Sequence, residues 1–296
     1  MKQPLVTIGL PAYNRPDLLK EALGSIVTQT YRDLEIVISD DCSPGTGTET
    51  VVRKFMKKDS RIQYIRQTKN LGAPENHRFV LEQASGEYFV WVDEDDVYDN
   101  TFVETGMRYL MNNPKYSAWL CSFKHTDLFD RVIWDYPSPS RFTATDSKKR
   151  DLAKYLFEPK ALGKASIFNS IFRKEAIAKT VREYSTNPKA GSEEAFVLGF
   201  LARYDFMGTD EVLFRKRSDL KKYNQADPGI RPVPFRKPLR SYKLKHFASA
   251  LREHYLAVRS TPHKNFVVYI MILRLPFLIR NHLWREVNAF RRFCKF

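Results

Sequence analysis

Short apolar runs alternate with segments of helical periodicity over the first hundred residues. The apolar runs predict buried strands, and they lie at residues 5–10, 34–39, 61–66 and 88–92. The segments between them predict helices, and they lie at residues 17–26, 48–58 and 74–85. Alternating strands and helices are typical of a parallel sheet with helices on both faces. We therefore expect an α/β fold.

Polar clusters follow three of these strands at their carboxyl ends: Tyr13-Asn14-Arg15, Asp40-Asp41 and Asp93–Asp96. Right-handed crossovers bring such ends to one edge of the sheet, where open α/β sheets bind their ligands. The four adjacent carboxylates of residues 93–96 suit a hard divalent cation such as Mg²⁺ or Mn²⁺. The alternative is a solvated acidic turn, because Asp is common in turns.

The combination of an aromatic ring, an arginine, two aspartates and a possible metal cluster suits a nucleotide diphosphate. The glycine patterns of a dinucleotide-binding fold and of a P-loop are both missing from the sequence. Binding through either of those two motifs is therefore not supported.

Beyond residue 100 the periodicity is weaker. It predicts a helix at 101–112, strands at 117–123, 166–172 and 206–214, and a loop over the site at 135–150. A further helix is expected to begin at Glu193 and Glu194, with Ser192 as its N-cap. Two carboxylates in the first turn are favourable there, so stabilisation of the helix is one interpretation of this pair.

The composition indicates a folded protein with a substantial core, since 43% of the 296 residues are hydrophobic and 14% are aromatic. That length accommodates one large domain or two modest ones. The first residues lack the pattern of a secretory signal or a transit peptide. Cys42, Cys121 and Cys294 show no pairing or metal spacing, so we expect a reducing cytoplasm.

The positive charge is concentrated at the end of the chain. Residues 211–296 contain 20 Lys and Arg but 5 Asp and Glu, whereas residues 1–100 contain 12 and 16. This tail holds a basic amphipathic segment at 240–258 and a 14-residue apolar run at 266–279, interrupted by Arg274 and Pro276. The run is shorter than the roughly 20 residues that span a bilayer. A helix in the membrane interface and a helix packed on the core are both compatible with it.

Five sequence segments together resemble the inverting family 2 glycosyltransferases, which have the GT-A fold. They are Val6–Arg15, Ser25–Tyr31, Glu35–Asp41 with Ser43, Asn70–Gly72 and Gly86–Asp96. Each segment is weak alone, but their order and spacing are specific. The resemblance is close over about residues 4–110, looser to about 217, and absent in the tail.

The resemblance implies roles for the residues at matching positions. Pro11, Ala12 and Tyr13 would line the nucleotide pocket, with Tyr13 near the base and Arg15 near the diphosphate. Asp41 would accept a hydrogen bond from the imide N–H of uracil or thymine. Tyr13 could instead belong to the core, and Asp40 or Asp41 could cap the next helix.

Asp93 and Asp95 resemble the DxD motif of this family. Asp93 would reach the ribose or a metal-bound water, and Asp95 would bind Mn²⁺ or Mg²⁺ directly. Asp96 would support these two residues without contacting the ion. Many relatives carry a metal- or phosphate-binding histidine after the last strand. Arg217 stands at that position here, so Arg215 or Arg217 would clamp the diphosphate instead.

The resemblance also implies the chemistry. Glu194, with Glu193 as the alternative, would take the proton from an acceptor hydroxyl while that hydroxyl attacks the anomeric carbon of the sugar. The metal ion would neutralise the departing diphosphate. One displacement inverts the anomeric configuration.

We therefore expect a Rossmann-like mixed sheet flanked by helices, with a basic helical extension at the C-terminus. Residues 1–217 would form the GT-A domain, divided into a nucleotide half (1–100) and an acceptor half (101–217), and residues 218–296 would form a membrane-associated tail. The donor would be a UDP- or dTDP-sugar, and the acceptor a lipid-linked saccharide for a bacterial surface polysaccharide at the inner face of the cell membrane. No nucleic-acid partner is expected. The alternative is a non-catalytic module that binds sugar nucleotides or membranes.

Overall fold

One mixed sheet organises the described part of the molecule. The computed structural model describes residues 3–135, 138–158, 164–184, 193–218 and 251–273. Within these residues nine strands pair in the order β3-β2-β1-β4-β8-β6-β9-β5, and β7 pairs with β6. The strands are β1 Val6–Ala12, β2 Leu34–Asp40, β3 Ile62–Arg66, β4 Tyr88–Trp91, β5 Val97–Tyr98, β6 Tyr116–Asp127, β7 Val132–Asp135, β8 Ile171–Arg173 and β9 Asp205–Ser218.

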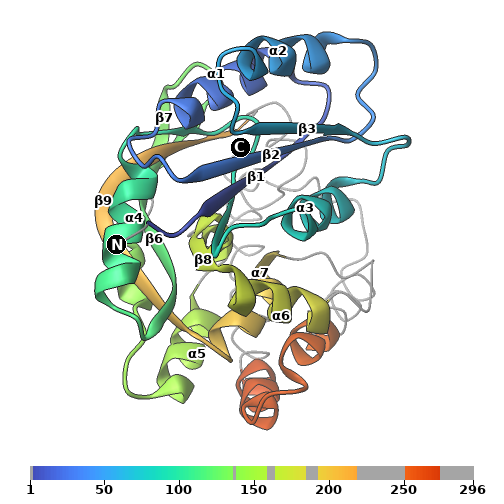
Figure 1. The fold of residues 1–296 in the computed structure, drawn as a ribbon. Helices are drawn as coiled ribbons and strands as arrows, with labels where there is room; N and C mark the ends of the chain where they lie inside the picture. The colour runs from blue at the N-terminus through green and yellow to red at the C-terminus, as the bar shows by residue number, and fades with distance from the viewer. Residues whose placement is uncertain (1–2, 136–137, 159–163, 185–192, 219–250, 274–296) are drawn as a thin grey trace, which may run out of the picture.

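Helices flank this sheet (Figure 1). They are α1 Pro16–Val27, α2 Gly47–Met56, α3 Ala73–Glu82, α4 Phe102–Asn112, α5 Lys148–Phe157, α6 Lys174–Tyr184 and α7 Glu193–Leu201, with 3-10 turns η1 Pro139–Phe142 and η3 Lys164–Asn169. The predicted α/β class, with a mixed sheet flanked by helices, is confirmed.

The first half of the sheet is parallel and buried on both faces. β1 pairs in parallel with β2 and β4, and β2 pairs in parallel with β3. All seven residues of β1 and all seven of β2 are buried, because α1 and α2 lie on one face and α3 lies on the other (Figure 1). Continuous apolar runs are what a parallel strand needs in that position.

The strand predicted at 166–172 begins later than its apolar character suggested. Residues 164–169 form the 3-10 turn η3, and only residues 171–173 form β8. Both the amide and the hydroxyl of Ser170 donate to the carbonyl of Ile167, at 3.2 and 2.6 Å. These local hydrogen bonds close a turn and compete with an extended conformation.

Within the loop predicted at 135–150, the described residues 138–144 pack against the first half of β9. Thr143 exchanges hydrogen bonds with the backbone of Gly208, and the amide of Ala144 donates to the carbonyl of Phe206 at 2.8 Å. A Cβ atom at Gly208 would collide with the carbonyl of Pro139, so the glycine permits this close approach. The segment therefore packs near the amino end of β9.

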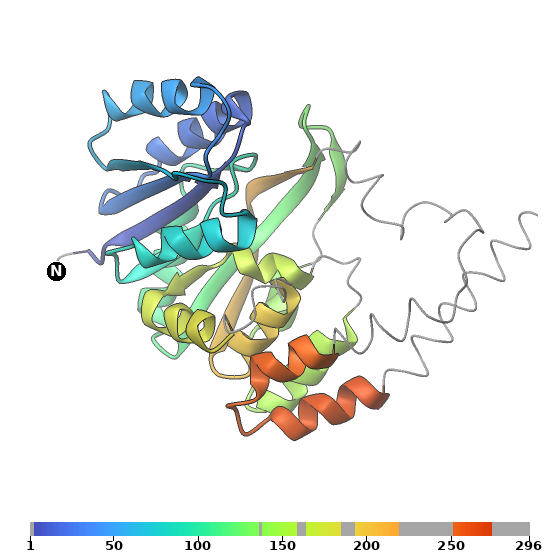
Figure 2. The same ribbon diagram turned by 90° about the vertical axis from the view of Figure 1, so that its right-hand side faces the viewer.

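Part of the basic tail packs against α7. Residues 251–258 and 264–273 are helical and lie beside this helix (Figure 2). The guanidinium group of Arg203 donates to the carbonyl of Ala257 at 2.8 Å and to the hydroxyl of Ser260 at 2.7 Å. Val258 and Val267 are fully buried. For residues 251–273, the alternative of helices packed on the core is therefore correct for one face of these helices.

The remaining tail, 219–250 and 274–296, lies outside the described residues. In the part of the chain that is described, no helix is both long enough and apolar enough to cross a bilayer. The predicted domain boundary at residue 217 stays a prediction.

Candidate active site

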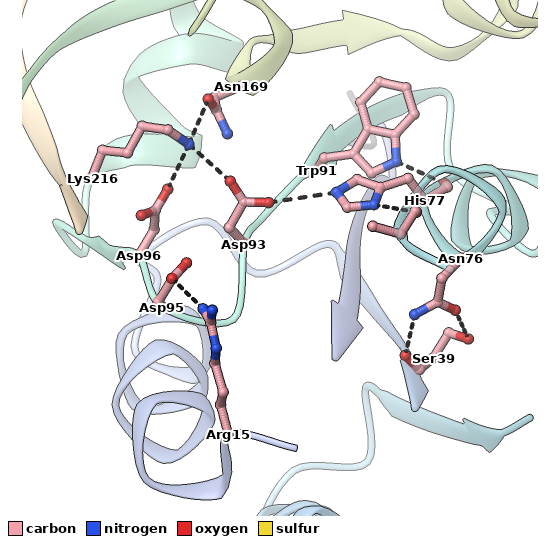
Figure 3. Close-up of polar contacts among 11 residues, drawn as sticks. Arg15, Ser39, Asn76, His77, Trp91, Asp93, Asp95, Asp96, Asn169 and Lys216 are labelled. Atoms are coloured by element: carbon pink, nitrogen blue, oxygen red, sulfur yellow. Dashed lines mark hydrogen bonds and ion pairs between the residues drawn. The ribbon is translucent and has the colours of Figure 1, made fainter. Parts of the chain in front are cut away.

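An acidic turn joins β4 to β5 at the carboxyl edge of the parallel strands. The amide of Asp96 donates to the carbonyl of Asp93 at 3.2 Å and closes the turn. The chain leaving β1 reaches the same place. The amide of Tyr13 donates to Glu94 Oε2 at 2.8 Å, and a guanidinium nitrogen of Arg15 lies 2.6 Å from Asp95 Oδ2 (Figure 3). The ends of β1 and β4 therefore converge, as the topology predicted.

Lys216 of β9 completes the cluster, and the sequence did not identify it. Its ammonium group lies 2.8 Å from Asp93 Oδ2 and 3.4 Å from Asp96 Oδ2. It also lies 3.3 Å from the amide oxygen of Asn169, which ends η3 (Figure 3). Because side chains alternate between the two faces of a strand, Lys216 lies on the opposite face from Arg215 and Arg217. The sequence does not indicate which of these two faces is turned toward the acidic turn.

His77 of α3 is a second residue that the sequence did not identify. Its Nε2 lies 3.5 Å from Asp93 Oδ1, and its Nδ1 lies 2.7 Å from the carbonyl of Ala73. Its own backbone carbonyl accepts the indole N–H of Trp91 at 2.9 Å. The ring of Phe168 stacks on Trp91 with centroids 4.2 Å apart. These contacts fix α3 and η3 relative to the acidic turn.

Aromatic packing also brings α7 to this site. Phe196 of α7 meets Trp91 and Phe168 edge to face, with centroid separations of 5.7 and 5.4 Å. Such pairs contribute about 0.5–1.5 kcal/mol each beyond their buried area. The first turn of α7 is thereby held near the carboxyl end of β4.

The carboxyl groups of the acidic turn differ in proton affinity. Burial raises the pKa of Glu94 to about 7, against the opposing effects of the Tyr13 amide and Arg15. Burial also raises the pKa values of Asp95 and Asp96. Burial acts in the same direction on Asp93, but the charge of Lys216 and the hydrogen bond from His77 outweigh it and hold the pKa of Asp93 well below its usual range. Asp93 is therefore the carboxyl group of the turn that most strongly favours the ionised form.

The end of β2 supplies two carboxylates with different surroundings. Asp40 accepts the hydroxyl of Tyr64 at 2.7 Å and the amide of Ser43 at 2.9 Å. Asp41 accepts the amides of Leu71 and Gly72 at 2.6 and 3.0 Å, one on each oxygen. A carboxylate oxygen accepts two hydrogen bonds, so with respect to the described residues each oxygen of Asp41 retains one acceptor position.

The predicted wall of the nucleotide pocket lies next to these carboxylates. Pro11 and Ala12 are the last residues of β1 and are buried. The side chain of Tyr13 follows them and is 46% exposed. Asn14 has a φ of 56°, and its amide donates to the hydroxyl of Ser43 at 2.8 Å. The two strand ends are thus tied together, with the Tyr13 ring accessible to solvent.

The two arginines expected to clamp a diphosphate contact another carboxylate. Arg217 binds Asp130 through two nitrogens at 2.8 and 2.9 Å and lies 2.7 Å from Glu21. Arg215 lies 3.5 Å from Asp130. The backbone amide of Arg217, rather than its side chain, reaches the acidic turn, donating to Asp96 at 2.9 Å.

The predicted pair of glutamates opens α7. Glu193 is exposed and begins the helix, and Glu194 is partly buried. The negative charge of Glu193 contributes to raising the pKa values of both Lys216 and His77 against the effect of burial. The backbone carbonyl of Glu194 accepts the hydroxyl of Tyr155 at 3.0 Å. The predicted N-cap, Ser192, lies outside the described residues.

The oxygens of Asp93 and Asp95 have the chemistry that Mn²⁺ and Mg²⁺ prefer. Both carboxylates are already engaged in ion pairs, with Lys216 and Arg15. Among the described residues, no group of three or more His, Cys, Asp or Glu side chains is arranged to hold a metal ion. The donor types therefore fit an ion, but binding it requires at least one ion pair to open.

Comparisons with known proteins agree on one family. The model of "Glycosyl transferase family 2" matches residues 7–180, more than half of the chain. The chain is 30% identical over 124 residues to the putative teichuronic acid biosynthesis glycosyltransferase TuaG of Bacillus subtilis, covering 42% of this chain and 46% of that protein. It is 40% identical over 94 residues to a GalNAc(5)-diNAcBac-PP-undecaprenol beta-1,3-glucosyltransferase of Campylobacter jejuni, covering 31% and 30%. The chain thus spans less than half of the length of these two relatives.

Solved structures with this fold include TarS of S. aureus (residues 1–349) in complex with UDP. The TM-score is 0.63 at 16% identity, covering 91% of this chain and 71% of that one. The mannosyltransferase PcManGT of Pyrobaculum calidifontis, in complex with GDP-Man and Mn²⁺, matches with a TM-score of 0.52 at 16% identity and covers 98% and 81%. At this identity the likeness concerns the fold.

Proposed function

The chain belongs to glycosyl transferase family 2, and from this premise we propose that it transfers a sugar from a UDP- or dTDP-sugar to a saccharide hydroxyl with inversion. One observation carries the proposal. The acidic turn 93–96, the end of β1 and the first turn of α7 meet at the carboxyl edge of the parallel strands, where α/β sheets bind ligands.

The donor nucleotide is proposed to lie between the ends of β1 and β2. The exposed Tyr13 ring offers a face for base stacking, and the remaining acceptor positions of Asp41 suit an imide N–H. Arg15, paired with Asp95, brings positive charge toward the diphosphate. Arg215 and Arg217 remain proposed phosphate contacts, which would require their contacts with Asp130 to loosen.

The general base is proposed to be Glu194, with Glu193 as the alternative. A carboxylate that removes the acceptor proton during attack accelerates such a step by roughly 10²–10⁴-fold. Glu193 contributes negative charge near Lys216, which supports the position of this helix end beside the donor. Glu194, one residue later, would then face the acceptor hydroxyl.

Asp95 and Asp93 are the residues proposed to hold Mn²⁺ or Mg²⁺. A bound ion would neutralise the negative charge of the departing diphosphate. Arg15 and Lys216, which now pair with these carboxylates, would rearrange on binding. The chain's own part in the chemistry is to orient the diphosphate and to accept the proton.

The acceptor is proposed to be a lipid-linked saccharide used in a bacterial surface polysaccharide, which places the protein at the inner face of the membrane. The C. jejuni relative, whose name specifies an undecaprenol-linked acceptor, supports this class. Tyr269, Ile272 and Leu273 on the described tail are 50–59% exposed, and the tail is strongly basic. Apolar side chains beside basic ones suit an anionic membrane surface.

The first experiment measures binding of UDP-, dTDP- and GDP-sugars by calorimetry, with and without Mn²⁺. The native protein is compared with Asp95→Ala and with Asp146→Ala, a matched control whose side chain is exposed and which follows the segment that packs near the amino end of β9. Metal-dependent binding of one donor, lost only in Asp95→Ala, supports the proposal. A folded native protein that binds no donor contradicts the enzymatic function and favours the alternative of a membrane-binding module.

Sedimentation with liposomes tests the proposed location. Vesicles containing anionic lipid should retain the protein, and neutral vesicles should retain less. A triple variant, Tyr269→Ser, Ile272→Ser and Leu273→Ser, should weaken retention because it removes the exposed apolar side chains. Equal retention of both proteins would count against this surface.

A further inference from the structure

The ammonium group of Lys216 lies among three side-chain oxygens at the acidic turn. They belong to Asp93 at 2.8 Å, Asn169 at 3.3 Å and Asp96 at 3.4 Å (Figure 3). Two carboxylates and an amide carbonyl are also donors that a hard divalent cation prefers. A positive charge of the protein itself therefore occupies the carboxylate that would attract the metal ion.

We propose that Lys216 competes directly with the divalent ion for Asp93, so that the ion binds only after the ammonium group leaves this carboxylate. This inference rests on the proposed function, in which Asp93 and Asp95 hold the ion. Lys216 would thus control the affinity of the acidic turn for the metal ion without itself contacting the substrate.

The surroundings of Asp93 leave little room for both cations. Its Oδ2 receives the ammonium group of Lys216, and its Oδ1 faces Nε2 of His77 at 3.5 Å. An ion bound to either oxygen would stand a few ångströms from the ammonium charge. Like charges at such separations repel strongly where solvent is partly excluded.

The surroundings of Asp96 show where Lys216 can go. The side chain of Asp96 is only 1% exposed, and a buried carboxylate is stabilised by a cation partner. Its other oxygen accepts the amide of Arg217 at 2.9 Å. On leaving Asp93, Lys216 therefore remains next to Asp96, and the displacement is a short movement along the turn.

The test is the affinity of the nucleotide-free protein for Mn²⁺, measured by electron paramagnetic resonance of the free ion. Lys216→Met removes the competing charge at nearly constant side-chain length. Its Mn²⁺ affinity should rise about 10- to 100-fold. This range corresponds to the free energy of one charge-assisted hydrogen bond, which the native protein must break before the ion binds and the variant lacks. Lys216→Gln, which retains an N–H donor for Asp96, should give the same direction and serves if the methionine variant does not fold.

Lys124→Met is the matched control. Lys124 is exposed on β6 and pairs in register with Arg215 of β9. This variant loses the same charge from the same end of the sheet without touching Asp93. Its Mn²⁺ affinity should stay within about twofold of the native value, because solvent and salt screen the charge of an exposed side chain.

Two results would overturn the inference. One is a folded Lys216 variant that binds Mn²⁺ no more tightly than the native protein, and the other is an equal gain in Lys124→Met. UDP binding, measured in parallel on the same proteins, separates this failure from a failure of the proposed function. A native protein that binds UDP while the variants gain no Mn²⁺ affinity would refute the competition alone.

Discussion

Glu35 is a buried carboxylate whose replacement has a calculable effect on stability. It lies on β2 with 9% of its surface exposed and accepts four hydrogen bonds. Thr7 and the amide of Ser85 donate to Oε2 at 2.5 and 2.9 Å. The hydroxyl of Ser85 and the amide of Gln63 donate to Oε1 at 2.7 and 3.0 Å. The carboxylate therefore links β1, β2, β3 and the turn before β4.

Glu35→Gln keeps the shape of the side chain and removes its charge. One amide oxygen can still accept two of the four hydrogen bonds, and the Ser85 hydroxyl can rotate to accept from the new NH₂ group. Gln63 must turn its own amide to do the same. Hydrogen bonds to charged groups contribute about 1.5–3 kcal/mol and neutral ones about 0.5–1.5. After this compensation we expect a loss of about 2 kcal/mol in the free energy of unfolding at pH 7.

The difference should depend on pH in a defined direction. Burial alone would raise the pKa of Glu35, but the four hydrogen bonds outweigh it, so the pKa in the folded protein is below its usual value. The ionised form therefore stabilises the fold above the pKa of the unfolded chain, about 4.3. That contribution is lost as the pH falls from there through the lower pKa of the folded protein.

Urea unfolding followed by tryptophan fluorescence measures this difference from pH 7 down to the lowest pH at which the native protein folds. Glu87→Gln, on an exposed side chain two residues beyond Ser85, should change stability by less than about 0.5 kcal/mol. A loss in Glu35→Gln that stays constant below pH 4 would refute the reasoning, because the charge would then not be its cause.

Three further predictions concern the site and the core. Asp41→Asn should weaken UDP binding about 10- to 100-fold by calorimetry, because an amide cannot accept on both sides as the carboxylate does; unchanged affinity would contradict its role. Glu194→Gln should reduce sugar transfer roughly 10²–10⁴-fold while sparing UDP binding, and Glu193→Gln should reduce it less; the reverse order would move the base to Glu193. Gly9→Ala should cost about 1–3 kcal/mol in urea unfolding, since its Cβ would lie 2.5 Å from a ring carbon of Phe89, whereas Gly24→Ala, with open space around it, should not destabilise.

The local pattern predicted the elements that depend on it. The apolar runs that became β1, β2 and β4 are buried along their length, and the polar residues after them converge because parallel strands share a carboxyl edge. Arg15 and Asp95, separated by 80 positions, form an ion pair for this reason. The first helix extends from Pro16 to Val27, one residue beyond each end of the predicted range 17–26.

The partners supplied by the second half of the chain could not be predicted in the same way. Lys216 reaches Asp93 across 123 positions, and the choice between it and its arginine neighbours depends on which side chains of β9 are turned toward the acidic turn. His77 and Asn169 belong to no recognisable motif, and their positions follow from the packing of Trp91 and Phe168. Such contacts are set by tertiary packing, which local periodicity does not encode.

The packing of residues 251–273 on α7 has a practical consequence for shortening the chain. Ala195 to Leu201 are all buried, so this helix has no face made for water, and part of its cover comes from beyond residue 250. A recombinant form ending at Ser218 would leave the helix that begins with Glu193 and Glu194 partly uncovered. We expect such a form to aggregate, and a form extended through residue 273 to remain in solution. Preparations intended for activity assays should therefore retain these residues.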